Sequence, residues 1–227
     1  MKNIKNIIIL ASGNGSNTVN IIRYFSKSGS KINVSAVISN IPDAPVINKV
    51  RNIGNQVAVF TVPFTKNTEI ITFEEKITEI VESYGIDYII LAGFMKVLSK
   101  EFVSRYEWRI INIHPSLLPA FKGKDAIKDA FNYGVKFTGV TIHFVTGEVD
   151  SGPVIMQGVL MISEEDNLST LESKVHALEH RMYPLVLELL ADDRIAIKNG
   201  KVKIHGENKK KFITALDLDQ FSSSINL

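Results

Sequence analysis

Ile7-Ile-Ile-Leu-Ala-Ser-Gly-Asn-Gly-Ser-Asn17 is the stretch that decides the fold of this chain. It begins with a continuous apolar run rich in β-branched residues, which is typical of a strand buried on both faces. A glycine-rich turn follows, and then the helical pattern of residues 19–25. A strand that passes through a tight turn directly into a helix begins a βαβ unit, so the sequence predicts a parallel sheet.

The same alternation of short apolar runs and helical patterns continues along the chain. It predicts strands at residues 33–40, 56–62, 88–92, 110–114, 138–145 and 154–162, and helices at residues 46–52, 69–84, 100–106, 126–133 and 168–190. A hairpin signal, Asn199-Gly200, separates two more short strands at 194–198 and 201–205. We therefore expect an α/β fold: a doubly wound, mostly parallel sheet flanked by helices, with antiparallel additions at the C-terminal side.

The composition is that of an ordinary globular protein. The chain has 227 residues, of which 45% are hydrophobic and 22% are charged. It shows no linker or internal repeat, so we expect one domain over residues 1–206 and a peripheral tail over 207–227. A net charge of +2 is too small to favour nucleic acid or an anionic membrane as a partner. The lack of cysteine excludes disulfides, thiolate metal sites and cysteine nucleophiles.

The sequence carries no export or membrane signal. The apolar run at residues 7–11 is too short for the hydrophobic region of a signal peptide. No segment approaches the roughly 20 apolar residues that are needed to span a bilayer. We therefore expect a cytoplasmic protein.

The glycine-rich turn, Ser12-Gly-Asn-Gly-Ser-Asn17, is a candidate anion site. It brings backbone N–H groups and the positive end of a helix dipole around one phosphate group. Ser16 and Asn17 can add side-chain hydrogen bonds or cap the helix. A nicotinamide cofactor is not favoured, because Thr18 replaces the third glycine of the dinucleotide fingerprint and the first 42 residues contain no Asp or Glu for the ribose. A tight turn without a ligand remains the alternative.

Asn112 and His114 interrupt a second buried run, Ile110-Ile-Asn-Ile-His114, just before Pro115. Residues two apart in a strand project to the same side, so these side chains should lie together where the strand ends. A neutral amide and a titratable imidazole in this position can polarise a carbonyl oxygen. Taken alone, the pair is equally compatible with two buried polar residues that hydrogen-bond at a strand end.

Asp150 lies in a turn-rich loop, Gly147-Glu-Val-Asp-Ser-Gly-Pro153, between two predicted strands. An aspartate in such a turn often only bonds its own backbone. The functional interpretation is that Asp150 meets His114, orients the imidazole and favours its protonated form. His143 alternates with apolar residues in its strand, and we interpret it as a packed histidine near the site rather than as the acid.

His176-Ala-Leu-Glu-His180 matches a short motif of one class of zinc peptidases. Two histidines four positions apart lie on one helix face, but two ligands do not complete a zinc site. No third ligand is compelling, so we predict no metal and interpret these residues as facing solvent or lining a site wall. Stoichiometric zinc in the purified protein would overturn this interpretation.

Five segments of the chain occur in the order that is characteristic of one enzyme family. They are Ser12–Asn17, Ala92–Ser99, Asn112–Pro119, Thr138–Val145 and Asp150–Gln157. Over about residues 5–205 the chain resembles the phosphoribosylglycinamide formyltransferases, a branch of the formyltransferase family that acts in purine biosynthesis. The resemblance implies a Rossmann-like formyltransferase fold. It also implies formyl transfer from the co-substrate 10-formyltetrahydrofolate to the amine of glycinamide ribonucleotide, with no metal.

The resemblance also implies a role for each matching position. Asn112 and His114 would stabilise the oxyanion that forms on the formyl group, and Asp150 would assist proton transfer. The residues implied for binding the substrate phosphate and ribose are Gly15, Ser16, Asn17 and Glu179. Those implied for binding folate are Met95, Lys96, Val97, Leu98 and Asn112, with loop 120–125 nearby.

Two positions differ from the family pattern, and one matches it only loosely. Lys96 and Val97 stand where relatives often have Arg and Ile, and these changes keep charge or shape. Relatives often carry a basic residue before the helix predicted at 69–84, where Lys66 is a loose match.

Other activities of the same family remain alternatives. A methionyl-tRNA formyltransferase would carry a tRNA-binding extension, whereas only about twenty residues follow His205. A formyltetrahydrofolate deformylase would carry an N-terminal regulatory domain, whereas the first strand begins within about ten residues of Met1. A non-catalytic binding module would lack part of the catalytic trio. The expected partners are the two small substrates, with no nucleic acid and no membrane, and the protein is expected to be a monomer or a homodimer.

Overall fold

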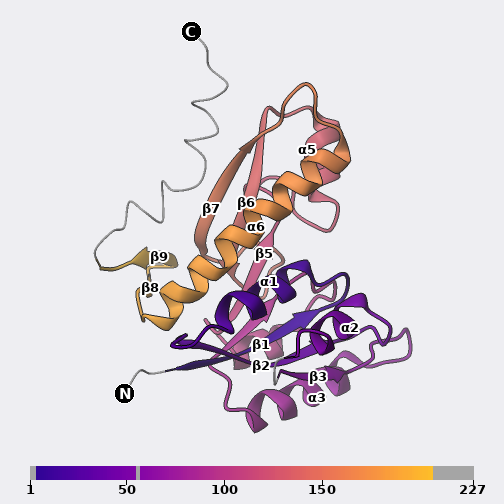
Figure 1. Cartoon of the computed structure of the whole chain (residues 1–227), viewed down its shortest axis with the longest axis vertical. Coiled ribbons are helices and arrows are strands. Elements are labelled where there is room, and N and C mark those ends of the chain that lie inside the picture. Colours follow the sequence, from indigo (N-terminus) through magenta and orange to yellow (C-terminus); the bar gives the residue numbers. More distant parts are fainter. Residues whose placement is uncertain (1–3, 55–56, 207–227) are drawn as a thin grey trace.

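The computed structural model describes residues 4–54 and 57–206. Its centre is a seven-stranded sheet in the order β3-β2-β1-β4-β5-β6-β7 (Figure 1). Strands β1 to β5 are parallel, whereas β6 runs antiparallel to β5, and β7 runs antiparallel to β6. The strands are β1 Lys5–Ala11, β2 Ile32–Ser39, β3 Ala58–Thr61, β4 Tyr88–Leu91, β5 Ile110–His114, β6 Phe137–Phe144 and β7 Val154–Met161. A separate hairpin pairs β8 Ile195–Lys198 with β9 Lys201–Ile204.

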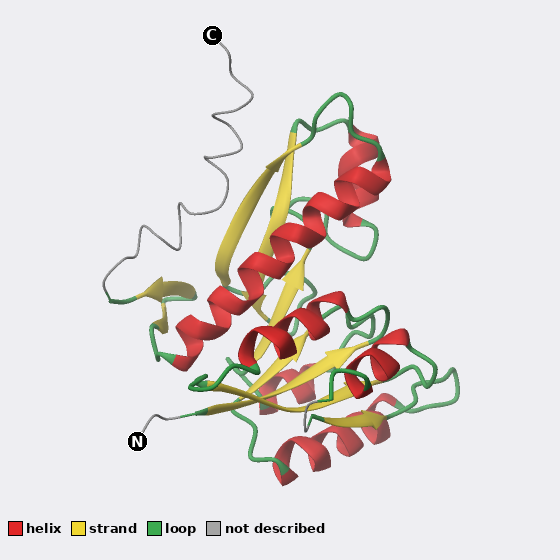
Figure 2. Cartoon of the chain, in the orientation of Figure 1, coloured by secondary structure: helices red, strands yellow, loops and turns green. Residues whose placement is uncertain are grey.

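Helices cover both faces of the sheet (Figure 2). They are α1 Ser16–Phe25, α2 Pro45–Arg51, α3 Ile70–Ser83, α4 Lys100–Arg105, α5 Ala126–Tyr133 and α6 Leu168–Ala191. Successive residues of β1 pack into different apolar clusters. Ile7 and Ile9 join residues of α1, α2 and α6, while Ile8 and Leu10 join residues of α3 and α4. Because both faces of β1 are buried, its apolar run is continuous rather than alternating.

The long helix α6 connects the C-terminal strands with α1. Its first turn is capped by Asn167 and Thr170, whose side chains each accept from the other's backbone N–H. Its apolar side chains share a core cluster with β6 and β7, which form a ribbon that extends beyond β5 (Figure 2). Farther along, Glu179 of α6 bonds Asn17 of α1. In this way α6 brings a buried carboxylate to the glycine-rich turn.

The predicted α/β architecture, mostly parallel with antiparallel additions at the C-terminal side, is confirmed. The helix predicted at 19–25 begins earlier, at Ser16, because Gly15 in the left-handed conformation is its N-cap. Ser16 and Asn17 therefore lie in the first turn and do not cap it. Strand β3 is shorter than predicted, and the tail 207–227 lies outside the described residues, so the domain boundary stays a prediction. In the described part of the chain, no helix is long and apolar enough to cross a membrane.

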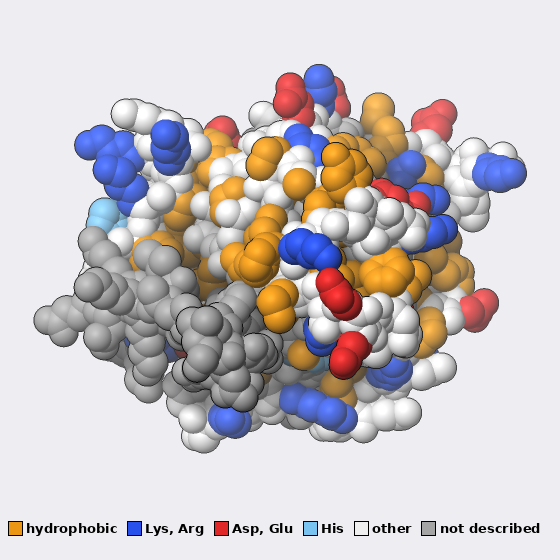
Figure 3. Space-filling model, turned by 90° about the horizontal axis from the view of Figure 1, so that it is seen from above, with side chains coloured by type: hydrophobic (Ala, Val, Ile, Leu, Met, Phe, Trp, Pro, Cys, Tyr) orange, Lys and Arg blue, Asp and Glu red, His pale blue; other side chains and the backbone are white. Residues whose placement is uncertain are grey.

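The outer edge strand, β7, exposes apolar side chains. Val154, Val159 and Met161 are 39%, 38% and 41% exposed. Figure 3 shows many hydrophobic side chains in the middle of one face, with charged side chains among and around them. An edge strand of this kind can pair with a second chain, so the prediction of a monomer or a homodimer stays open.

Candidate active site

The carboxyl end of β5 carries Asn112 and His114. The antiparallel neighbour β6 places His143 opposite Asn112, and Thr141 opposite His114. Directly opposite residues of an antiparallel pair project to the same face, so the side chains of Asn112, His114 and His143 emerge together. Both histidines are buried, with 5% and 1% exposure. The strand end therefore holds two buried histidines beside the partly exposed side chain of Asn112.

Asp150 lies between the two histidines. Its Oδ2 is 3.4 Å from Nδ1 of His114, and its Oδ1 is 3.7 Å from Nε2 of His143. The Asp150 side chain is 8% exposed, so water screens these interactions only weakly. The loop that carries Asp150 approaches β6 closely at Gly152, where a Cβ atom would lie 1.8 Å from the carbonyl oxygen of Phe144. Only glycine fits there.

His143 acts as a hydrogen-bond acceptor toward Asn112. Burial lowers the pKa of its imidazole, and its Nδ1 lies 2.9 Å from the carbonyl oxygen of Phe144. Nδ1 therefore carries the proton and donates it, which leaves the Nε2 lone pair to accept from Asn112 Nδ2 at 3.3 Å. This bond orients the Asn112 amide and leaves its other Nδ2 hydrogen for a ligand.

Loop 120–125 lies against the His114–Asp150 pair. The carbonyl oxygen of Phe121 is 2.8 Å from His114 Nε2, so Nε2–H donates to it. The backbone N–H of Gly123 donates to Asp150 Oδ2 at 3.1 Å. His114 thus has an oxygen acceptor at each ring nitrogen, and the doubly protonated ring would donate to both.

The predicted phosphate site lies at the N-terminus of α1. Gly15 is the N-cap with a φ of 73°, and a Cβ atom there would lie 2.2 Å from Cγ2 of Val46. Glycine alone suits both the conformation and the space. The first N–H groups of α1 have no partner within the helix, so an anion at this end meets these donors and the positive end of the helix dipole.

Glu179 is buried beside this turn. Its Oε2 accepts from Asn17 Nδ2 at 2.9 Å and lies 2.9 Å from His176 Nδ1. The hydrogen bond to Glu179 raises the pKa of His176, whereas burial lowers the pKa of His180. The Oδ1 atom of Asn17 is buried without a hydrogen-bond partner. The histidine-rich segment of α6 therefore borders the predicted phosphate site.

A pocket of about 510 Å³ lies beside the predicted phosphate site. Ser16 and Arg23 of α1 and Lys49 of α2 are among its lining residues, which include no Asp or Glu. Lys49 also donates to the side chain of Asn14 in the glycine-rich turn. Lys49 thus lies close to the N-terminus of α1 and favours a negatively charged ligand there, whereas Arg23 lies in the last turn of the helix.

The predicted folate segment follows β4. Met95 and Val97 are 69% and 62% exposed, so their apolar side chains form a surface that a flat ligand can cover. Lys96 instead lies over the ring of Phe64, with its Nζ 3.8 Å from the ring centroid. Leu98 is buried in the core. Of the four predicted residues, two present their side chains outward, and the other two pack onto the protein.

Ser12 ties the folate segment to the glycine-rich turn. Its hydroxyl accepts from the backbone N–H of Met95 at 2.8 Å and donates to the Asn40 side chain at 2.6 Å. Its backbone N–H donates to the carbonyl oxygen of Gly93 at 3.0 Å. The two segments that are predicted to bind different substrates are therefore held together at the carboxyl edge of the sheet.

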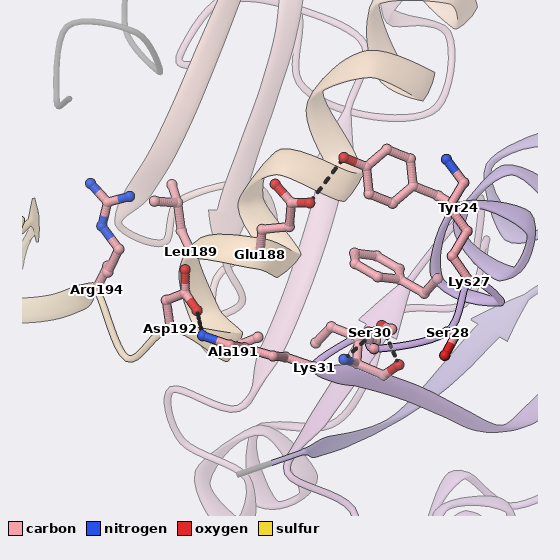
Figure 4. A pocket seen from close by; sticks show the side chains of 13 residues that line it. Tyr24, Lys27, Ser28, Ser30, Lys31, Glu188, Leu189, Ala191, Asp192 and Arg194 are labelled. Carbon is pink, nitrogen blue, oxygen red and sulfur yellow. Dashed lines mark hydrogen bonds and ion pairs between the residues drawn. The ribbon is translucent and has the colours of Figure 1, made fainter. Parts of the chain in front are cut away.

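A further pocket lies apart from this edge. Within residues 4–54 and 57–206, no group of three or more His, Cys, Asp or Glu is arranged to hold a metal ion. A pocket of about 470 Å³ lies between the end of α1, the loop before β2 and the end of α6 (Figure 4). In it, Tyr24 bonds Glu188 and Lys31 bonds Asp192. It opens at the amino ends of the strands, opposite the cluster around His114.

Sequence reasoning missed the contacts that loop 120–125 makes with the cluster. The groups involved are the carbonyl of Phe121 and the N–H of Gly123, and backbone groups leave no signature because every position has them. Sequence reasoning also missed Thr141, whose hydroxyl is buried and bonded to the segment after Pro115. Its hydroxyl stands in an otherwise apolar strand, and this could have indicated a buried hydrogen-bonding role.

Known proteins resemble the chain along most of its length. Residues 5–187 match the family model described as formyl transferase. The phosphoribosylglycinamide formyltransferase of Bacillus subtilis is 36% identical over 187 residues, which cover 82% of this chain and 95% of that protein. The human trifunctional purine biosynthetic protein adenosine-3 is 36% identical over 197 residues, and the chain spans 19% of its length.

A solved structure extends this similarity to three dimensions. The crystal structure of phosphoribosylglycinamide formyltransferase from Anaplasma phagocytophilum has a TM-score of 0.83 and 37% identity, and the match covers 91% of this chain and 97% of that one. The family model, the near full-length relative and the structure agree. The chain belongs to the formyltransferase family, among its phosphoribosylglycinamide formyltransferases.

Proposed function

We propose that this protein transfers the formyl group of 10-formyltetrahydrofolate to the amine of glycinamide ribonucleotide, a step of de novo purine biosynthesis. The observation that carries the proposal is the meeting of Asn112, His114 and Asp150 at the carboxyl end of β5. The glycine-rich turn and the 95–98 segment follow β1 and β4, which precede β5 in the sheet order. In an open parallel sheet, ligands bind outside the carboxyl ends of the strands.

Formyl transfer needs stabilisation of an oxyanion. The amine nitrogen attacks the formyl carbon, a C–N bond forms, and an electron pair of the carbonyl moves onto its oxygen. The remaining Nδ2 hydrogen of Asn112 donates to this oxygen, and a positive charge on His114 stabilises it where water screens little. The bond between the formyl carbon and the folate nitrogen then breaks, and the nitrogen keeps the electron pair.

The proton lost by the attacking amine has to reach the departing folate nitrogen. We assign this transfer to Asp150, acting through water. Its Oδ2 faces His114 and accepts from Gly123, so Oδ1 is the oxygen that receives the proton. The atoms balance, because the folate nitrogen takes the proton that the amine gives up.

Two roles are open to His114 in stabilising the oxyanion, and they require different positions of loop 120–125. With Nε2–H bonded to the Phe121 carbonyl, the ring acts on the oxyanion as a nearby cation. Direct donation from Nε2 to the formyl oxygen requires loop 120–125 to move away. We propose that the loop stays in place and that the ring acts as this nearby cation.

The acceptor substrate fits the other half of the site. Its phosphate binds the N–H groups at the start of α1 and the side chains of Ser16 and Asn17, with the positive charge of Lys49 nearby. Glu179 uses Oε2 for Asn17, and we assign its Oε1 to the ribose hydroxyls. The exposed side chains of Met95 and Val97 cover the folate ring from the side of β4.

One assay tests this function. Purified protein is incubated with 10-formyltetrahydrofolate, with and without glycinamide ribonucleotide, and both tetrahydrofolate and the formylated acceptor are measured. We expect tetrahydrofolate to be released only when glycinamide ribonucleotide is present, in an amount equal to that of the formylated acceptor. Release without the acceptor would indicate a deformylase instead, and no release in either reaction would refute the proposal.

The two small substrates are the partners that we infer, with no nucleic acid and no membrane. The cytoplasmic location and the choice between monomer and homodimer stay predictions. Sedimentation of the purified protein over a range of concentrations decides between the two oligomeric states.

A further inference from the structure

We propose that Gln157 of β7 is a positioning residue for formyl transfer, because it fixes the loop whose Phe121 carbonyl binds His114. This inference rests on the proposed role of His114 in catalysis. Gln157 lies on the second strand from His114 in the sheet order, and it acts through the loop rather than on a reacting atom.

The side-chain amide of Gln157 holds two groups at once. Its Nε2 donates to the carbonyl oxygen of Leu118 at 3.0 Å and to Oγ1 of Thr141 at 3.0 Å. Gln157 is itself exposed, and water can replace the hydrogen bonds of an exposed amide at little cost in folding stability. Because one bond reaches the segment that leads into the loop and the other reaches β6, we infer that Gln157 holds the loop in place rather than the fold.

Thr141 is the anchoring point on the protein side. Its hydroxyl donates to the carbonyl oxygen of Ser116 at 2.7 Å and accepts from the N–H of Leu118 at 3.1 Å. The bond from Gln157 fills the second acceptor position, so the hydroxyl has no hydrogen-bonding capacity left. Thr141 is fully buried. Gln157 thus completes a saturated junction between β6, β7 and the segment that follows β5.

The junction sets the place of the Phe121 carbonyl. Ser116 Oγ donates to the carbonyl oxygen of Ala120 at 2.6 Å, so residues 116–120 form a closed turn. Phe121 is the next residue, and its carbonyl oxygen meets His114 Nε2 at 2.8 Å. Thr141 is also the residue directly opposite His114 in the β5–β6 ladder. The loop is therefore anchored beside the ring that it binds.

Loss of the Gln157 side chain should change the hydrogen bonding and the orientation of the His114 ring. With the Phe121 carbonyl in place, Nε2 is held as N–H. When the loop loosens, Nε2 loses its acceptor, and the ring can rotate or give up that proton. Asp150 and His143 face His114, and the charge of Lys122 in the same loop acts on His143. Substitution of Gln157 changes none of these three side chains.

Two substitutions separate hydrogen bonding from shape. Gln157→Glu keeps the size of the side chain but replaces the donor by an acceptor, and Gln157→Leu removes both. Val159→Ala is the matched control, because Val159 is exposed on the same strand two residues farther along. We expect kcat to fall about tenfold in both Gln157 variants, as one or two lost hydrogen bonds predict. KM for both substrates and the melting temperature should stay near the wild-type values, and the control should behave as wild type.

A spectroscopic readout tests the contact without turnover. Nitrogen-15 spectra of labelled histidines in the free protein report which ring nitrogens carry hydrogen, and the spectrum of His114→Ala identifies the His114 signals among the 5 histidines. We expect the Nε2 signal of His114 to move toward that of an unprotonated nitrogen in Gln157→Leu. An unchanged His114 spectrum, or wild-type kcat in both Gln157 variants, would overturn the inference. If the wild type transfers no formyl group, the proposed function fails, while the spectra still test the loop contact.

Discussion

The molecule contains two clusters in which an acid lies near two histidines, and they are built in opposite ways. At the end of β5, Asp150 lies 3.4 Å from His114 and 3.7 Å from His143, and these residues come from separate segments. On α6, by contrast, Glu179 and its two histidines lie within five consecutive residues. The scattered residues form the proposed catalytic centre, whereas the compact motif borders the proposed phosphate site.

The carboxylate also has different contacts in the two clusters. Asp150 faces both of its histidines, but only His114 can donate to it, because His143 carries its proton on Nδ1. Glu179 bonds His176 and Asn17, which links α6 to the glycine-rich turn. A short motif of histidines and an acid therefore does not define a chemical function by itself. What the acid contacts depends on the residues that the fold places beside it.

The largest expected effect falls on the first cluster. Asn112→Leu keeps a similar volume and removes the donor to the oxyanion, so kcat should fall by about 10²–10³. KM for glycinamide ribonucleotide should change little, because the phosphate and the ribose bind elsewhere. Steady-state kinetics measure both constants. A kcat within about threefold of the wild type would place the oxyanion stabilisation on other groups.

A smaller effect of another kind is expected on the second cluster. Glu179→Gln keeps the shape but removes the charge that holds His176 and Asn17, so KM for glycinamide ribonucleotide should rise about tenfold. The same measurement should show kcat nearly unchanged, because Glu179 does not reach the formyl group in the proposed site. A lower kcat at unchanged KM would mean that Glu179 acts in the chemical step rather than in substrate binding.

His176 and His143 should also differ in how pH affects stability, whereas His180, whose pKa burial lowers, should act with the sign of His143. Because Glu179 raises the pKa of His176, the folded state binds this proton more tightly than the unfolded state. The stabilisation is full below the unfolded pKa of about 6.5 and is lost as pH rises through the folded pKa. Burial lowers the pKa of His143, so its contribution has the opposite sign, and stability falls as pH drops below about 6.5.

Melting temperatures test whether the protonated form of His176 stabilises the fold at low pH. The difference in melting temperature between wild type and His176→Gln should be larger at about pH 6 than at about pH 8. A difference that is equal at both values would show that the bond between His176 and Glu179 does not depend on protonation.

The smallest effect is expected from metal removal. If the compact motif on α6 holds no zinc, dialysis against a chelator should leave formyl transfer at the wild-type rate. Metal analysis of the purified protein should then find zinc well below one ion per chain. One zinc ion per chain, together with loss of activity after chelation, would instead make α6 a metal site.

Local patterns were sufficient to predict most of the fold. The run at β1 is continuous because both of its faces are buried, and Pro115 ends β5 because proline lacks an N–H donor. The start of α1 was misplaced by local reasoning. The helix begins at Ser16, since the left-handed conformation of Gly15 provides the N-cap without a side-chain bond.

The site was less accessible to such reasoning. That Asn112 and His114 share a side follows from strand geometry, but the approach of Asp150 depends on how a distant loop folds back on β6. The resemblance to a family supplied that expectation. Contacts through the Phe121 carbonyl and the Gly123 N–H could not be predicted from side-chain patterns, because they depend only on the path of the backbone.

Formyl transfer by Asp150→Asn, measured beside the wild type at saturating 10-formyltetrahydrofolate and glycinamide ribonucleotide, tests the assignment of the catalytic centre most directly. We predict kcat lower by at least about 10² in the variant, with KM for glycinamide ribonucleotide and the melting temperature near the wild-type values, because the proton transfer is lost while the phosphate site is intact. A variant with wild-type kcat would contradict the assignment of Asp150 to the chemical step.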